Sequence, residues 1–348
     1  MSATPAVPPL PAPGAALPPL PKGRYTSSHL ARWCAAQRNW DKIHYDLDYA
    51  QRVAGLRERV INGALKQHLL VQCLDEAFDA LPWIRRIAFR FTGPDYVGER
   101  LEVRGTVRSV LNDAGRPRVV VDLSIHNLEQ DRATTTGWAL LEWPHGDRRD
   151  ADPAALPPDF ALDESVEPPS GPVPAAIAAR VGAEDERIES AGPLDASRLR
   201  LFADAVGGLR PEHYDDAAGR AGRHGTVVAP PLFPIHGLEA HPGQWPLSED
   251  PEALGREGVN EIGRNLSRRF GLPSRGIVNG GGDVEVFSLL RVGETVCAAS
   301  TLAGASVKRS AQGGAMLLTT ALNTYRTRDG RLLLKERQTT VHRHFETP

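Results

Sequence analysis

Apolar and polar positions repeat along the chain at an offset of 169 residues. The stretches that begin at His29 and Arg198 both place apolar residues about three apart and then break at a polar segment. This spacing predicts an amphipathic helix followed by a turn. Each stretch ends in the tripeptide His-Tyr-Asp, at residues 44–46 and again at 213–215. The sequence therefore contains an internal repeat.

A longer apolar pattern follows the first tripeptide. Counted from Gly63, apolar residues recur with helical spacing at Leu65, Leu69, Leu70, Cys73, Leu74 and Phe78. The spacing predicts a long helix that begins at Gly63. The second half has the apolar stretch "GTVVAPPLFPIHGLEA" at this point, and we expect the same order of elements there.

Both halves end in segments with alternating β-branched residues and turns at "DAG" and "RDG". These segments predict an antiparallel sheet built from hairpins. Since the order helix, turn, long helix and strands occurs twice, the chain is predicted to be a duplicated α+β unit.

Proline-rich segments divide the chain. Residues 1–24 are rich in proline and alanine and are predicted to form a disordered tail. Residues 146–193 are proline-rich and acidic and are predicted to form a linker. The two repeated units then occupy residues 25–145 and 194–348.

Composition narrows the classes of partner. Of the 348 residues, 41% are hydrophobic and 24% charged, and the net charge is −2. These values are typical of a soluble globular protein and give no electrostatic case for nucleic acid or membrane binding. The three cysteines lie far apart without a CxxC pair. We therefore expect a cytoplasmic protein without a metal site.

The segment "NWDKIHYD", residues 39–46, resembles the hydratase signature of the MaoC-like dehydratases and hydratases. The similarity is to the branch of mesaconyl-CoA hydratases and 3-hydroxyacyl-thioester dehydratases. In the second half, "FADAVGGLRPEHYD", "VAPPLF" and "RVGETV" resemble the MaoC dehydratase N-terminal domain. The resemblance covers most of residues 25–145 and 195–345. It implies a tandem hotdog fold, in which each half wraps a curved antiparallel sheet around a long central helix.

The resemblance also implies hydration or dehydration of an enoyl or 3-hydroxyacyl thioester in the first half. His44 suits a general base because its pKa lies near neutrality. The backbone N–H of Gly63, at the start of the long helix, would hold the thioester oxygen. We expect Asn62 and Tyr45 to contact the substrate.

The second acid-base group is left open between Asn39 and Asp41. In the commoner family signature an aspartate occupies the position of Asn39. Asparagine orients a water molecule but does not take a proton. Asp41 lies three residues before His44. It either replaces the missing acid or caps the turn.

The second half is expected to be mostly structural and to shape a substrate channel. Pro230 and Pro231 stand where the first half has its helix-start glycine, and proline has no N–H to donate. No cofactor is expected beyond the coenzyme A or phosphopantetheine carried by the substrate. An acyl carrier protein and a second copy of the chain are the expected partners.

Two alternatives remain at this point. The chain is either a repurposed family member, acting as a dehydratase or cyclase in natural-product biosynthesis, or a non-catalytic subunit that completes another hotdog protein.

Overall fold

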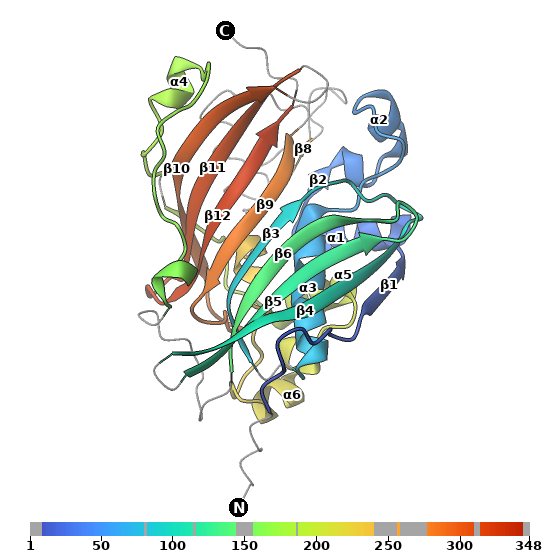
Figure 1. The fold of residues 1–348 in the computed structure, drawn as a ribbon, viewed down its shortest axis with the longest axis vertical. Helices are drawn as coiled ribbons and strands as arrows, with labels where there is room; N and C mark the ends of the chain where they lie inside the picture. The colour runs from blue at the N-terminus through green and yellow to red at the C-terminus, as the bar shows by residue number, and fades with distance from the viewer. Residues whose placement is uncertain are drawn as a thin grey trace, which may run out of the picture.

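The computed structural model describes residues 9–79, 82–113, 116–143, 156–185, 187–239, 256–257, 277–309 and 314–343. Ten strands form one antiparallel sheet in the order β1–β4–β5–β6–β3–β9–β12–β11–β10–β7. Figure 1 shows that β3–β6 and β9–β12 form two curved arrays that join edge to edge. The strands are β1 Leu20–Arg24, β3 Trp83–Phe91, β4 Arg100–Asp113, β5 Arg116–Asn127, β6 Arg132–Glu142, β7 Ile188–Glu189, β9 Ile277–Val286, β10 Val296–Arg309, β11 Ala315–Thr327 and β12 Leu332–His342.

The order of strands is the same in both halves when read outward from the centre of the sheet. The central pair is β3 and β9, and each half then continues through its fourth, third and second strand. This symmetry confirms the predicted duplication and the hairpin-built antiparallel sheet. A separate two-stranded pair joins β2 Trp40–Asp41 to β8 Arg256–Glu257.

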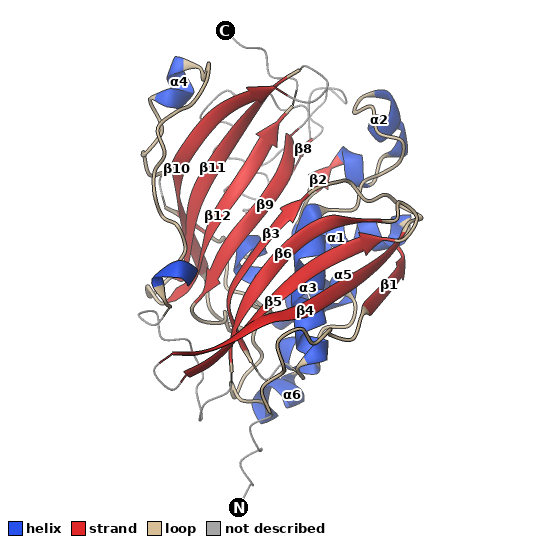
Figure 2. Cartoon of the chain, viewed as in Figure 1, coloured by secondary structure: helices blue, strands red, loops and turns tan. Residues whose placement is uncertain are grey.

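The long helix and the two amphipathic helices lie together on one face of the sheet (Figure 2). The long helix predicted from Gly63 is α3 Gly63–Ala77, and its residues Leu65, Leu69 and Leu70 are fully buried. The two predicted amphipathic helices are α1 Ser27–Gln37 and α5 Ala196–Val206, which pack on each other. The remaining helices are η1 Lys42–His44, α2 Leu47–Arg52, η2 Pro158–Phe160, α4 Ala175–Ala178, η3 Pro211–His213, α6 Asp216–Ala221 and η4 Phe233–His236.

The second half does not form the expected long helix within residues 227–239. The described chain there has only the short 3-10 helix η4. Three prolines at positions 230, 231 and 234 explain the difference. Proline lacks an N–H for the helical ladder, and it disfavours helical backbone at the preceding residue.

Glycine makes the junction of the two arrays possible. Gly281 in β9 has a φ of 134°, and a Cβ there would lie 2.3 Å from the carbonyl oxygen of Phe89 in β3. Arg86 and Asp283 add an ion pair across the same junction, with an Nε–Oδ1 distance of 2.7 Å. The sequence "NGGGD" at residues 279–283 thus serves the close approach of two backbones.

The expectation of a disordered tail is wrong for residues 9–24. β1 pairs with β4, and the Leu17 N–H donates to the Gly105 oxygen at 2.9 Å. The edge of β4 offers backbone groups that require partners, and a proline-containing strand is tolerated at such an edge. Residues 1–8 lie outside the described chain.

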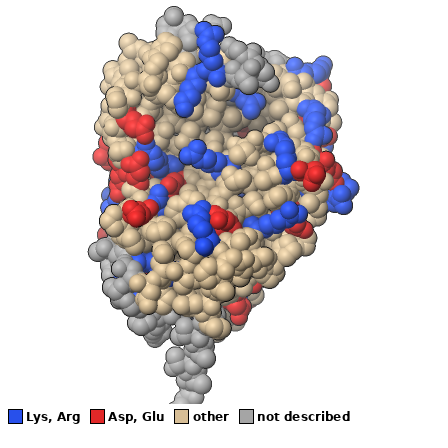
Figure 3. All heavy atoms as spheres, viewed as in Figure 1, with Lys and Arg blue, Asp and Glu red and all other residues tan. Residues whose placement is uncertain are grey.

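The predicted linker also pairs with an edge of the sheet, in the part that the structure describes. Residues 167–185 and 187–190 run beside β10, and Glu167 and Ser170 donate backbone hydrogen bonds to β10 at 2.7 and 3.0 Å. Figure 3 shows basic and acidic side chains interspersed on the viewed face, in keeping with the near-zero net charge. Among the described helices, none has the length and apolar character needed to cross a bilayer.

Candidate active site

The turn before α2 is held by its own side chains. Asn39 Oδ1 accepts a hydrogen bond from the Asp41 N–H at 3.0 Å. Asp41 precedes η1 and accepts from the Ile43 N–H at 3.4 Å. Asp46 caps α2 by accepting from the Tyr49 N–H at 3.0 Å. Such Asx contacts fix the backbone on both sides of His44.

His44 is buried, with 8% of its surface exposed. Its Nδ1 lies 2.7 Å from the Val60 carbonyl oxygen. A carbonyl only accepts, so Nδ1 carries the proton and Nε2 of the neutral ring is free to take one. Burial lowers the pKa of His44, and the Asp41 charge and the Val60 hydrogen bond oppose that shift. The imidazole is therefore a neutral base at pH 7.

The start of α3 lies beside this histidine in the cavity wall. Asn62 precedes the helix, and its carbonyl accepts from the N–H groups of Leu65 and Lys66 at 3.1 and 3.2 Å. The N–H groups of the helix's first two residues, Gly63 and Ala64, have no intrahelical acceptor. They lie at the positive end of the helix dipole. A Cβ at Gly63 would come within 2.9 Å of the Phe91 ring.

Asn62 has an unusual environment. Its side chain is 1% exposed, and neither amide atom forms a hydrogen bond of ordinary geometry with the described residues. The Cys34 thiol lies close to it; burial raises the pKa of this thiol to about 12, and the Asn62 contact opposes the rise. A buried amide left in this state favours a ligand that completes its hydrogen bonds.

These residues surround one cavity of about 350 Å³. It brings together five of the six predicted site residues, namely Asn39, Asp41, His44, Asn62 and Gly63. Among the described residues that line it, Asp41 is the only carboxylate. The other wall comes from the second half, through Ile235, His236, Ile277, Val278, Asn279, Gln338, Thr340 and Arg343.

Tyr45 is not among the lining residues, contrary to the prediction that it contacts substrate. Its hydroxyl donates to the Trp40 carbonyl at 3.1 Å, and 37% of its surface is exposed. The 3-10 turn directs His44 inward and its neighbour outward. The tyrosine thus braces the outside of the turn.

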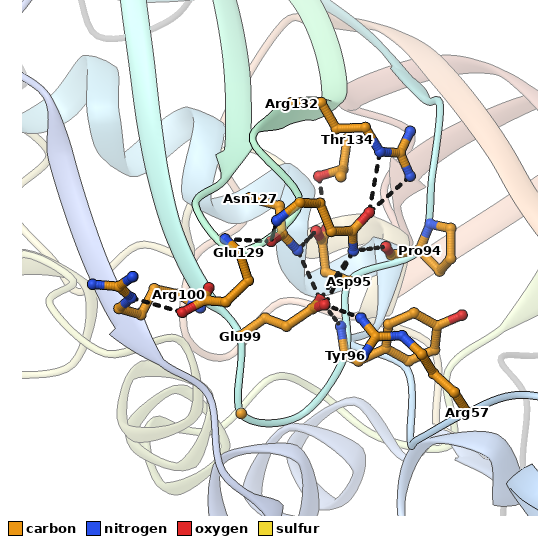
Figure 4. Close-up of polar contacts among 12 residues, drawn as sticks. Arg57, Pro94, Asp95, Tyr96, Glu99, Arg100, Asn127, Glu129, Arg132 and Thr134 are labelled. Atoms are coloured by element: carbon orange, nitrogen blue, oxygen red, sulfur yellow. Dashed lines mark hydrogen bonds and ion pairs between the residues drawn. The ribbon is translucent and has the colours of Figure 1, made fainter.

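A charged network supports the wall formed by residues 91–94. Lys66 Nζ lies 2.8 Å from a carboxylate oxygen of Asp95, and both side chains are buried. Asn127 and Thr134 donate to the same carboxylate at 2.8 and 2.9 Å (Figure 4). Burial lowers the pKa of Lys66, and Asp95 opposes the shift. Figure 4 also shows Glu99, which accepts from Asn127 at 2.7 Å.

Sequence reasoning missed three polar residues at another part of the cavity. Gln37, Gln67 and His236 line it, and His236 contacts both glutamines. A signal was present in "LKQHLL", because polar residues interrupt the apolar pattern of α3 at a buried position.

The second tripeptide has a different surrounding. His213 Nδ1 lies 2.8 Å from the Val228 oxygen, but the adjoining cavity measures about 20 Å³. Its lining includes Pro231, Glu212 and Arg223. This volume has room for about one water molecule.

Two family profiles match the chain, one in each half. Residues 11–97 match hydroxyacyl-thioester dehydratase type 2. Residues 181–336 match a FAS1-like dehydratase domain region. No curated protein sequence matches significantly.

Several solved structures share the fold over nearly the whole chain. A putative MaoC domain protein dehydratase from Chloroflexus aurantiacus has a TM-score of 0.63 at 13% identity, covering 96% of each chain. A MaoC-like dehydratase has a TM-score of 0.59 at 13% identity, covering 94% of this chain and 97% of that one. A conserved hypothetical protein of Mycobacterium tuberculosis, described as a double hotdog, has a TM-score of 0.57 at 14% identity, covering 95% and 96%. At such identities the likeness shows the fold, which is the predicted double hotdog.

Proposed function

Because the chain belongs to the MaoC-like double-hotdog dehydratases, we propose that it adds water to an enoyl thioester, or removes it from a 3-hydroxyacyl thioester, in the cavity beside His44. The observation that carries this proposal is the meeting of three groups in one cavity. They are a histidine with its Nε2 free, a single lining carboxylate and a helix start with glycine. Hydration needs a base, a group that supports its charge, and a donor to the thioester oxygen.

In the hydration direction, His44 Nε2 removes a proton from water while the water oxygen bonds to C3. The electron pair of the C2=C3 bond moves toward the thioester, and the carbonyl oxygen gains enolate charge. The Gly63 N–H donates to that oxygen. The imidazolium then returns its proton to C2, which completes the addition. Dehydration follows the same steps in reverse.

We assign Asp41 to support the imidazolium and orient the water. Its charge raises the pKa of His44, which means that it stabilises the protonated ring. Asn39 acts through the turn, since its Oδ1 already accepts the Asp41 N–H. It is a positioning residue in this scheme.

The direct test is turnover of crotonyl-, mesaconyl- and longer enoyl-coenzyme A, followed by the loss of enoyl absorbance. The same acyl groups on an acyl carrier protein identify the preferred carrier. If no thioester is turned over in either the hydration or the dehydration direction, the proposal is wrong.

Two substitutions separate the roles of the paired residues. Asp41→Asn should lower kcat by about 10²-fold and move the acid limb of the kcat/KM profile to lower pH, because a charge that raises the His44 pKa is removed. Asn39→Asp keeps the acceptor for the turn and should stay near the wild-type rate. A severe loss in Asn39→Asp together with a mild one in Asp41→Asn reverses the assignment.

A further inference from the structure

One part of the cavity wall is a cluster of neutral polar side chains that the reaction above does not use. Gln37 ends α1, Gln67 lies in α3 and His236 ends η4. All three line the cavity and are at least 92% buried. Three elements from distant parts of the sequence thus build this inner cluster.

The hydrogen bonds within the inner cluster leave the buried amide oxygen of Gln37 unpaired. His236 Nδ1 lies 3.3 Å from the Gln37 amide nitrogen, and His236 Nε2 lies 3.1 Å from that of Gln67. His68 adds a contact to His236 Nε2 at 3.0 Å. Gln37 Oε1 has no partner among the described residues. If the Gln37 amide is flipped, so that Oε1 and Nε2 exchange places, its nitrogen becomes the unpaired atom instead.

Burying an unpaired amide group costs free energy, so this end of Gln37 favours a ligand that hydrogen-bonds to it. The aromatic packing keeps the cluster in place. The rings of Trp33 and Phe202 lie 5.7 and 6.1 Å from the ring of His236. The free amide atom is therefore held in a fixed position rather than on a mobile side chain.

The charges around the inner cluster disfavour an ionic ligand group. Burial lowers the pKa of His236 to about 3, helped by the Arg198 charge, and burial lowers that of His68 well below its usual value. Both rings are neutral at pH 7. Arg198 itself donates to the carbonyl oxygens of His236 and Gly237 and lies 3.3 Å from the Glu239 carboxylate. A carboxylate placed here would be desolvated beside two neutral rings, with the nearby Arg198 already paired to Glu239.

The position along α3 relates the cluster to the reacting atoms. Gln67 follows Gly63 by four residues, which is one helical turn and about 6 Å along the axis. A thioester whose carbonyl oxygen meets the Gly63 N–H has the remainder of its acyl chain to place within the same cavity. The inner cluster is reached by carbons beyond the reacting pair.

We propose that Gln37, Gln67 and His236 form a subsite for a neutral hydroxyl group carried on the acyl chain beyond C3. This inference rests on the proposed function. A hydroxyl both donates and accepts, so it satisfies the free end of Gln37 in either orientation of the amide. An alkyl chain leaves that end unpaired, and a carboxylate introduces an uncompensated charge.

The test compares hex-2-enoyl-coenzyme A with its 6-hydroxy derivative on the intact protein. Wild type should show a kcat/KM at least about tenfold higher for the hydroxylated substrate, the effect of one added hydrogen bond to a buried group. Gln37→Leu has a similar volume without the amide. It should abolish the preference by lowering kcat/KM more for the hydroxylated substrate than for the other.

Gln338→Leu is the matched control, because Gln338 lines the same cavity but is not part of the inner cluster. It should keep the wild-type preference, whatever its effect on overall rate. Loss of preference in Gln338→Leu rather than Gln37→Leu overturns the inference. So does equal turnover of both substrates by wild type, which needs no variant and leaves the proposed hydration intact. Absence of turnover with any enoyl thioester instead overturns the proposed function.

Discussion

The two His-Tyr-Asp turns share a local geometry and differ in their surroundings. His44 and His213 each contact a valine carbonyl oxygen through Nδ1, at 2.7 and 2.8 Å. Both are buried, and burial lowers the pKa of both. The aspartates that follow, Asp46 and Asp215, cap the short helices α2 and α6. The tripeptide is therefore a structural element of the repeat.

The surroundings determine what each histidine can do. The valine contacted by His44 leads into Asn62 and Gly63, and the one contacted by His213 leads into Pro230 and Pro231. Only the first path supplies N–H groups at the start of a long helix. The cavities differ likewise, at about 350 and 20 Å³. The histidine motif is a candidate reaction centre where a helix start with available N–H groups and a cavity both lie next to it.

The largest effect is expected from replacing His44, and the same replacement of His213 is its control. His44→Gln should lower kcat for an enoyl thioester by about 10²- to 10⁴-fold, the usual value of a general base. His213→Gln, the control in the same local geometry, should leave kcat within about threefold, since a structural loss acts on stability. Steady-state rates and thermal unfolding of both variants check this. Equal losses of kcat would contradict the difference assigned to the halves.

The next largest effect is expected when proline, which the second half has at this point of the repeat, replaces Gly63 in the first half. Gly63→Pro removes the proposed oxyanion donor and should lower kcat by about 10²- to 10³-fold. Proline is accepted at the first helical position, and Asn62 already has the extended backbone that precedes proline, with φ −59° and ψ 129°.

Gly63→Ala is the control, because it adds the Cβ near Phe91 and keeps the N–H. It should lose less activity than Gly63→Pro. A rate for Gly63→Ala as low as that of Gly63→Pro would assign the loss to the contact with Phe91 instead of the donor. Circular dichroism establishes that both variants retain α3.

The two halves also differ in the partners of a buried carboxylate. Asp95 in the first half is paired with Lys66. Glu336 in the second half is 2% exposed and accepts from Asn323 and Tyr325 at 3.0 and 3.3 Å, both of them neutral. Burial raises the pKa of Glu336 from 4.5 to about 7. The folded state thus favours its protonated form.

The smallest effect follows from this raised pKa. Its contribution to stability is present below pH 4.5 and is lost as the pH rises through about 7. Glu336→Gln has no such loss. Relative to wild type, it should therefore gain stability between about pH 5 and 8, by a difference on the order of 3 kcal/mol.

Urea unfolding at several pH values measures the difference. Asp122→Asn, at a half-exposed carboxylate of β5, should reproduce the wild-type pH dependence. Parallel curves for wild type and Glu336→Gln would mean that Glu336 stays ionised in the folded protein.

The elements that sequence predicted well are those fixed by local patterns. The apolar spacing from Leu65 to Phe78 is enough to predict α3, although the helix is buried on all sides from Leu65 to Leu74. Asn39 and Asp41 both act in the turn, as their side chains suggest. The lack of a long helix within residues 227–239 also follows from a local pattern, namely Pro230, Pro231 and Pro234.

The elements that sequence did not predict depend on partners far along the chain. Pairing of β3 with β9 joins residues 86–90 to residues 281–285, and no local pattern encodes that register. The inner cluster likewise joins Gln37 to His236 across 199 residues. The outward direction of Tyr45 follows from a 3-10 turn whose geometry its sequence neighbours do not specify.

The two ends of the ten-stranded sheet are closed by chain from outside the repeat. Residues 14–24 cover part of β4, and residues 167–185 and 187–190 cover part of β10. Open strand edges invite self-association and fibril growth, and short proline-bearing cover strands block both. These flanking segments therefore hide part of the long strands β4 and β10 and leave only the short strands β1 and β7 at the edges of the sheet.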